Sequence, residues 1–134
     1  MSMTQLQIKL VRESWEAARR EPLALKMLFY ERLFYLAPET RPVFQGVGHA
    51  KILIRNLQAI VDRLEVLDDS SFFIPCLADE FVPMAVRATH YSVIGEALLW
   101  TIEKRVGCRW NGQTRLAWQV FYDTLTAVVR KIAA

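Results

Sequence analysis

The chain has 134 residues, of which 53% are apolar, and 17 basic against 14 acidic side chains give a net charge of +3. This length and apolar content favour one compact domain, residues 1–134, that needs no disulfide or structural metal. Because basic residues are mixed with acidic ones and no apolar stretch has signal or membrane length, we expect a cytoplasmic protein that binds neither nucleic acid nor membranes.

The first half of the chain predicts two helices followed by a proline-rich corner. Thr4 and Gln7 form a capping box, and apolar residues at helical spacing continue to near Arg20. Pro22 suits the first turn of a second helix, which Pro38 ends. The predicted core faces are Ile8, Val11, Trp15 and Ala18 in the first helix and Leu25, Leu28, Phe29, Leu33 and Leu36 in the second.

The second half predicts a long helix, an irregular stretch and two further long helices. An apolar stripe from Leu53 to Leu67 indicates a packed helix. A polar turn at 68–71 and Pro83 limit the next stretch to a short helix. The chain is therefore predicted to be all-α. In the last two helices, separated at 111–112, the expected core residues are Tyr91, Ile94, Leu98 and Ile102, then Ala117, Phe121, Leu125, Val128 and Ile132.

This order of elements, together with several sequence runs, resembles the single-domain haemoglobins of bacteria. LVRESW at 10–15 resembles their first helix, and LFYERLF at 28–34 with APETRPVF at 37–44 resembles their second helix and the corner after it. HYSVIGEALL at 90–99 and AWQVFY at 117–122 resemble their last two helices. The resemblance covers nearly the whole chain. It implies an all-α globin fold of about six to seven helices, with a short or disrupted proximal helix.

The resemblance assigns three side chains to the distal side of a haem group. Tyr30 matches the tyrosine that donates a hydrogen bond to iron-bound gas, and Phe44 matches the phenylalanine that packs on the haem. His49 matches the distal position, which faces the sixth iron site, and is the candidate metal ligand. The alternatives are a core tyrosine with a locally bonded hydroxyl, a core phenylalanine, and an exposed histidine before the long helix.

The proximal position, which holds the iron in these proteins, carries no histidine. Counting back from HYSVIG places Phe81 there, whereas a short deletion places Met84 there, with a weaker thioether ligand. The chain has two histidines, His49 and His90, and His90 matches a residue that is not a ligand in the relatives. Tyr91 matches the tyrosine that supports the proximal histidine and here would support nothing.

Two functions follow. The first is a haem-free or weakly haem-binding module for sensing or interaction with a regulatory partner, in which bulky phenylalanines such as Phe81 fill the porphyrin space. The second is a haem protein that binds oxygen or another diatomic gas through His49, with or without Met84. The cofactor is accordingly none or haem. We expect no enzyme, because the chain lacks a reductase, a nucleophile elbow, a phosphate-cradling glycine loop and a zinc motif.

Four of the large aromatic residues in the region of the last two helices are candidates for a surface patch. A homodimer through these helices is predicted, since globin-fold regulators often pair there; the alternative is that the aromatics complete the core. Cys76 and Cys108 lack metal-ligand spacing and are predicted to be free, buried thiols. The four aromatic residues are Trp100, Trp110, Trp118 and Tyr122.

Overall fold

All regular structure in the described part of the chain is helical. The computed structural model describes residues 3–44, 55, 57–66 and 88–133, and of these it places the side chains of all but 43, 44, 66, 88–91 and 128–133. The elements are α1 (Gln5–Ala18), α2 (Pro22–Leu36), η1 (Pro38–Thr40), α3 (Arg41–Phe44), a helical segment at 57–61, η2 (Leu64–Val66), α6 (Ala88–Val106), η3 (Gly107–Arg109) and α7 (Gly112–Ala133).

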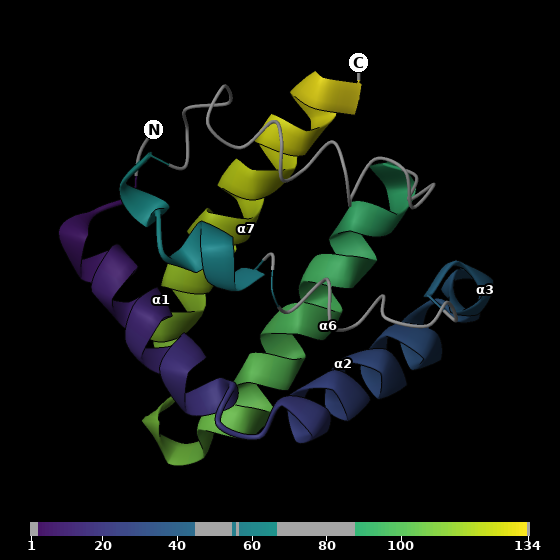
Figure 1. The fold of residues 1–134 in the computed structure, drawn as a ribbon, viewed down its shortest axis with the longest axis horizontal. Helices are drawn as coiled ribbons and strands as arrows, with labels where there is room; N and C mark the ends of the chain where they lie inside the picture. Colours follow the sequence, from purple (N-terminus) through teal and green to yellow (C-terminus); the bar gives the residue numbers. More distant parts are fainter. Residues whose placement is uncertain (1–2, 45–54, 56, 67–87, 134) are drawn as a thin grey trace.

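Four of these helices form the frame of the molecule. Figure 1 shows α6 and α7 joined at the η3 turn, with α2 packed along α6 and α1 crossing α7. Helix α1 also contacts α6, so it bridges the two C-terminal helices. The described helices are in line with the expected six to seven, whereas the predicted proximal segment before residue 88 lies outside the described residues.

Helix α1 begins and packs as predicted. The Thr4 hydroxyl accepts a hydrogen bond from the Gln7 N–H at 3.1 Å, and the Gln7 side chain accepts one from the Thr4 N–H at 3.0 Å. These two bonds complete the capping box and satisfy donors that the first turn would otherwise leave unpaired. The four predicted core residues of α1 are all buried.

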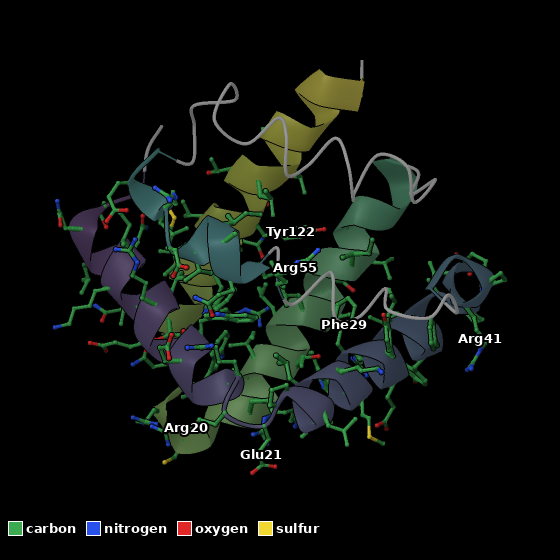
Figure 2. The ribbon with its side chains drawn as sticks, viewed as in Figure 1. Arg20, Glu21, Phe29, Arg41, Arg55 and Tyr122 are labelled. Atoms are coloured by element: carbon green, nitrogen blue, oxygen red, sulfur yellow. The ribbon has the colours of Figure 1, made fainter. Side chains whose placement is uncertain are left out.

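Helix α2 has Pro22 in its first turn, as predicted, but only part of its predicted face is buried. Leu25, Phe29 and Leu33 are buried, and Phe29 lies between α2 and α6 (Figure 2). The prediction was wrong for Leu28 and Leu36, which are half-buried. The helix is apolar on most sides, so its pattern alone does not single out the face that meets α6.

The predicted helix from Leu53 to Leu67 ends early. Helix continues to residue 61, a turn follows at 62–63, and η2 completes the stretch. Arg12 of α1 takes up the carbonyl groups at this end: its Nε donates to the Val61 carbonyl at 3.1 Å and its Nη2 to the Asp62 carbonyl at 3.0 Å. An arginine that pairs with the last carbonyls of a helix stabilises its end there. The predicted core residues Leu57, Ile60, Val61 and Leu64 are buried.

The turn between α6 and α7 depends on one residue with positive φ. Gly107 has φ of 72°, the left-handed conformation that glycine adopts at the ends of helices. Asn111 then accepts a hydrogen bond from the Thr114 N–H at 2.9 Å and caps α7. Cys108 in this turn is a free thiol but is exposed, so its predicted burial was wrong, because the turn lies outside the core. Cys76 lies outside the described residues.

The centre of the core lies where α1 meets α7. Trp15, Trp118 and Phe121 are fully buried, with the two indole rings 6.3 Å apart and Phe121 edge-on to Trp118 at 5.4 Å. The Trp15 indole N–H donates to the side chain of Gln58 at 2.7 Å. The segment 57–61 is therefore held against α1 by both polar and apolar contacts.

Candidate functional site

Tyr30, the predicted hydrogen-bond donor to bound gas, lies half-buried in a row of aromatic rings on α2. Its ring stacks on Phe34 with centroids 5.4 Å apart and planes 2° apart, and it contacts Phe29 at 5.6 Å. The Arg41 guanidinium lies 4.6 Å from the centre of the Phe34 ring. Burial raises the pKa of the Tyr30 hydroxyl above its ordinary value of 10.0. The hydroxyl is therefore protonated at neutral pH and able to donate.

Apolar side chains from three other parts of the chain belong to the same core as this row. Tyr30 and Phe34 pack against a buried cluster to which the segment 57–66, α6 and α7 contribute. Both a porphyrin and packed side chains are compatible with apolar surroundings, so the iron ligands decide between them. These apolar side chains include Leu57, Val61 and Leu64 of the segment 57–66, Ile94 and Leu98 of α6, and Leu125 of α7.

The side chains of the remaining predicted site residues lie outside the part of the chain that the structure describes. His49, Phe81 and Met84 lie outside the described residues. Phe44 ends α3 and Tyr91 lies in the first turn of α6, but their side chains also lie outside the description. Their roles around a haem group stay predictions, and among the predicted site residues Tyr30 alone has described surroundings.

A salt bridge that sequence analysis missed holds the segment 57–66 on α1. The Arg12 guanidinium donates to both carboxylate oxygens of Glu65, at 2.7 and 2.8 Å. This two-fold hydrogen bond, aided by a backbone bond within Glu65, lowers the pKa of the Glu65 carboxyl from 4.5 to about 2. Because the two residues are 53 positions apart, no local pattern in the sequence pairs them.

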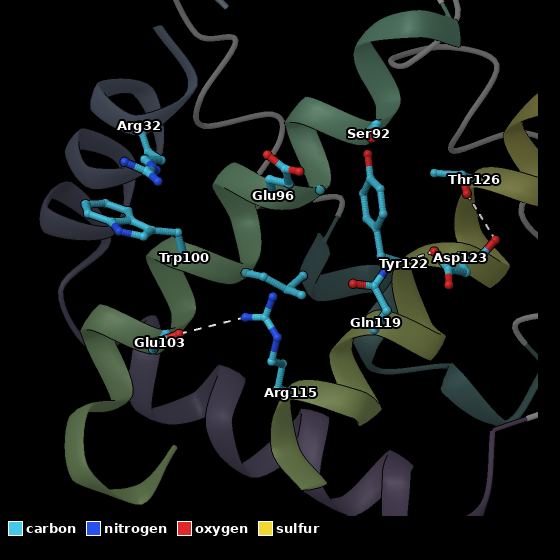
Figure 3. A pocket seen from close by; sticks show the side chains of 12 residues that line it. Arg32, Ser92, Glu96, Trp100, Glu103, Arg115, Gln119, Tyr122, Asp123 and Thr126 are labelled. Atoms are coloured by element: carbon cyan, nitrogen blue, oxygen red, sulfur yellow. Dashed lines mark hydrogen bonds and ion pairs between the residues drawn. The ribbon is translucent and has the colours of Figure 1, made fainter. Parts of the chain in front are cut away.

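A groove of about 510 Å³ lies between α6 and α7 and reaches α2. Figure 3 shows side chains from all three helices directed toward it, with Arg32 beside Trp100 at one end and Tyr122 near Ser92 at the other. Its lining carries charges of both signs, and the Glu103–Arg115 pair spans it weakly, with 4.0 Å between nitrogen and oxygen. The charged residues of the groove are Arg32, Glu96, Glu103, Arg115 and Asp123.

The aromatic residues expected to form a dimer patch are largely internal. Trp118 is fully buried and Tyr122 nearly so, while Trp100 and Trp110 are half-buried. The Tyr122 ring lies against Gly95 of α6. These positions favour the alternative in which the aromatics complete the core, so a dimer through α6 and α7 would need a different surface.

Comparison with known proteins identifies the family. The globin family model matches residues 28–129. The chain belongs to the globin family. This globin is 28% identical to a leghemoglobin of Canavalia lineata, over 97% of this chain and 95% of that protein. It is also 28% identical to leghemoglobin 49 of Vicia faba, over 98% of both chains.

A solved structure supports the fold of this globin independently. The bacterial globin of Campylobacter jejuni superposes with a TM-score of 0.80, covering 97% of this chain and 96% of the other at 24% sequence identity. The all-α globin fold predicted from the sequence is thereby confirmed.

The described residues form neither a membrane-spanning helix nor a cluster of metal-binding side chains. No described helix is long and apolar enough to cross a membrane. The described residues also bring together no group of three or more His, Cys, Asp or Glu side chains that could hold a metal ion.

Proposed function

We propose that this globin is a haem-free or weakly haem-binding module for sensing or interaction in the cytoplasm. The observation that carries the proposal is the lack of histidine at either register of the proximal position, which holds Phe81 or Met84. A phenylalanine has no lone pair for iron, and a thioether is a weak ligand for gas carriage. The donor set does not fit conventional haem ligation on the proximal side, and we derive no reaction through haem.

The placement of the second histidine supports the same proposal. His90 is the third residue of α6, in its first turn. In the resemblance it matches a histidine that is not a ligand, which leaves His49 as the one imidazole assigned to the pocket. In this proposal the regulatory partner is a protein or small molecule that binds the folded module directly. The signal is not a gas bound to iron. We expect no catalysis by this chain alone, because a reaction such as nitric-oxide dioxygenation needs oxygen on iron and a reductase.

A second candidate function is gas binding by haem held through His49, with or without Met84. The burial of Tyr30 favours it, since a protonated hydroxyl in apolar surroundings is suited to donate to a bound ligand. The relatives named leghemoglobin favour it as well. If haem is bound, it supplies the iron, while Tyr30 supplies the hydrogen bond.

The visible spectrum of the purified protein separates the two functions. The protein is expressed with a haem precursor in the medium, and hemin is then titrated into the haem-free fraction while the melting temperature is followed. We expect no stoichiometric Soret band and no change in melting temperature. A ligand that binds only the folded state would raise stability, by about 2.7 kcal/mol at one hundred times its dissociation constant. A stoichiometric band would overturn the haem-free proposal.

The two histidines provide a matched pair of variants for the case in which a band appears. Loss of the band in His49→Ala, but not in His90→Ala, would assign the iron to the distal side. Loss of the band in Met84→Ala would likewise show that the Met84 thioether binds the iron. Tyr30→Phe removes only the hydroxyl, so it would change the rate of gas release and leave the haem content unchanged.

A further inference from the structure

Two opposite charges that line the groove between α6 and α7 have no charged partner among the residues that the structure describes. The Arg32 guanidinium lies over the rings of Tyr35 and Trp100, at 5.3 and 5.2 Å from their centres. Its Nε atom is buried and, within the described part of the chain, has no hydrogen-bond partner. Glu96 is exposed and makes no hydrogen bond or ion pair with any described residue. Both residues line the same groove.

The other charged groups of the groove are already engaged. Glu103 and Arg115 approach each other at 4.0 Å, and Asp123 accepts a hydrogen bond from the Gln119 side chain at 2.9 Å. Within the described part of the chain, the groove therefore presents one cation and one anion that form no ion pair with each other or with another residue. A carboxylate from another molecule would pair with the partly exposed guanidinium group of Arg32 through a charge-assisted bond.

We propose that a second copy of this chain occupies the groove, with Arg32 of each copy paired to Glu96 of the other. In a two-fold dimer, if residue i of one copy contacts residue j of its partner, residue j contacts residue i as well. One unpaired arginine and one unpaired glutamate on a single surface meet that requirement. A partner of one charge sign would satisfy only half of the surface.

The side chains beside the groove fit a protein partner. Tyr35 is 74% exposed, and Trp100 is half-buried beneath Arg32. Tyrosine, tryptophan and arginine are the residues that contribute most to protein–protein interfaces, because they combine apolar area with hydrogen-bonding groups. The interface thus includes α2 as well as the last two helices. It uses charges at its centre rather than the internal rings of Trp118 and Tyr122.

Charge reversal tests the pairing by sedimentation equilibrium, with protein from the low micromolar range upward. We expect wild type to dimerise, and R32E and E96R each to weaken the dimer at least about tenfold, because each places like charges opposite one another. Mixing R32E with E96R should then give a heterodimer of near wild-type affinity, since the mixture restores opposite charges at both contacts. Circular dichroism checks that each variant is folded.

A matched control uses an exposed ion pair elsewhere. Lys9 and Glu13 on α1 lie 3.9 Å apart, with side chains 70% and 64% exposed, so K9E and E13R should leave dimerisation unchanged. A monomeric wild type, a dimer insensitive to R32E and E96R, or the lack of association on mixing would each overturn the proposal. If R32E does not fold, E96R alone decides, because Glu96 is exposed and its reversal must weaken the dimer. The test does not depend on whether haem is bound.

Discussion

At the scale of single residues, the indole N–H groups of Trp15 and Trp118 in the core donate to side chains far away in the sequence. The Trp118 indole N–H donates to the Ser14 hydroxyl at 2.7 Å, across 104 positions. Ser14 in turn donates to the Leu10 carbonyl at 2.6 Å. A buried donor that loses its acceptor costs more than the bond contributes when present. Ser14 therefore matters more to stability than a small polar residue on a helix ordinarily does.

Replacing Ser14 with alanine should lower the free energy of unfolding by about 1–3 kcal/mol, because it leaves the buried Trp118 N–H without a hydrogen-bond acceptor. Urea denaturation measures the loss, and exposed Ser92→Ala on α6 is the control, expected within about 0.5 kcal/mol of wild type. In a Trp118→Phe background the serine has no indole to accept from, so Ser14→Ala should cost less. An equal loss in both backgrounds would contradict the role of this hydrogen bond.

The Arg12–Glu65 pair predicts a pH dependence at the acid end. Since the folded-state pKa of Glu65 is lowered from 4.5 to about 2, the pair stabilises the fold fully above pH 4.5. That contribution is lost as the pH falls toward 2. The difference in free energy of unfolding between wild type and Glu65→Gln should therefore shrink over this interval.

Urea unfolding along a pH series measures this difference. Because the Glu65 side chain is 57% exposed, the difference should be modest and should decrease in high salt. Glu13→Gln, which removes the looser contact with Lys9, is the control and should show little pH dependence. A difference that is the same at every pH would argue against the pairing.

At the scale of elements, α6 and α7 are closely fitted at one point. The Tyr122 ring lies on Gly95, where an added Cβ would clash with the ring carbons Cε2 and Cδ2. Glycine inside a helix is intrinsically unfavourable compared with alanine. Its presence in the middle of α6 is therefore explained by the close approach of a ring from α7.

Gly95→Ala should destabilise the protein by about 1–3 kcal/mol, because the new methyl group displaces the ring. Helix propensity alone would give the opposite sign. Gly112→Ala is the matched control, since nothing lies within 4 Å of a Cβ at the first position of α7. Thermal denaturation followed by circular dichroism measures both. A higher melting temperature for Gly95→Ala would show that the ring does not constrain this site.

At the scale of the whole molecule, α2 separates the proposed dimer surface from the predicted haem side. Tyr30 packs in the aromatic row beside the core, whereas Arg32 lines the groove. Residues two positions apart in a helix point about 200° apart, which places the two side chains on opposite sides of α2. The question of haem and the question of the dimer therefore concern different surfaces.

This separation predicts that the two properties are independent. R32E and E96R should leave the visible spectrum and the response to hemin as in wild type, and His49→Ala should leave the dimer dissociation constant unchanged. Spectra and sedimentation of the same samples measure both. Altered hemin binding in the groove variants would show that the two surfaces are coupled.

Much of the frame follows from local sequence signals. The capping box at Thr4, the proline at the start of α2 and the core face of α1 were predicted correctly, because each depends on residues within a few positions of one another. The role of Tyr30 as a donor to bound gas stays a prediction, and the structure shows only that its ring is half-buried beside the core. The roles of His49, Phe81 and Met84 rest on the sequence resemblance alone, because these residues lie outside the described ranges.

Only the tertiary structure decided the features that join distant parts of the chain. The end of the helical segment at residue 61 depends on Arg12, and the role of Glu65 depends on the same side chain. Arg32 and Glu96, which form no ion pair with any described residue, line one groove because α2 packs along α6. Local patterns carry the spacing of apolar residues along a helix, but pairing and burial across helices arise only once those helices pack together.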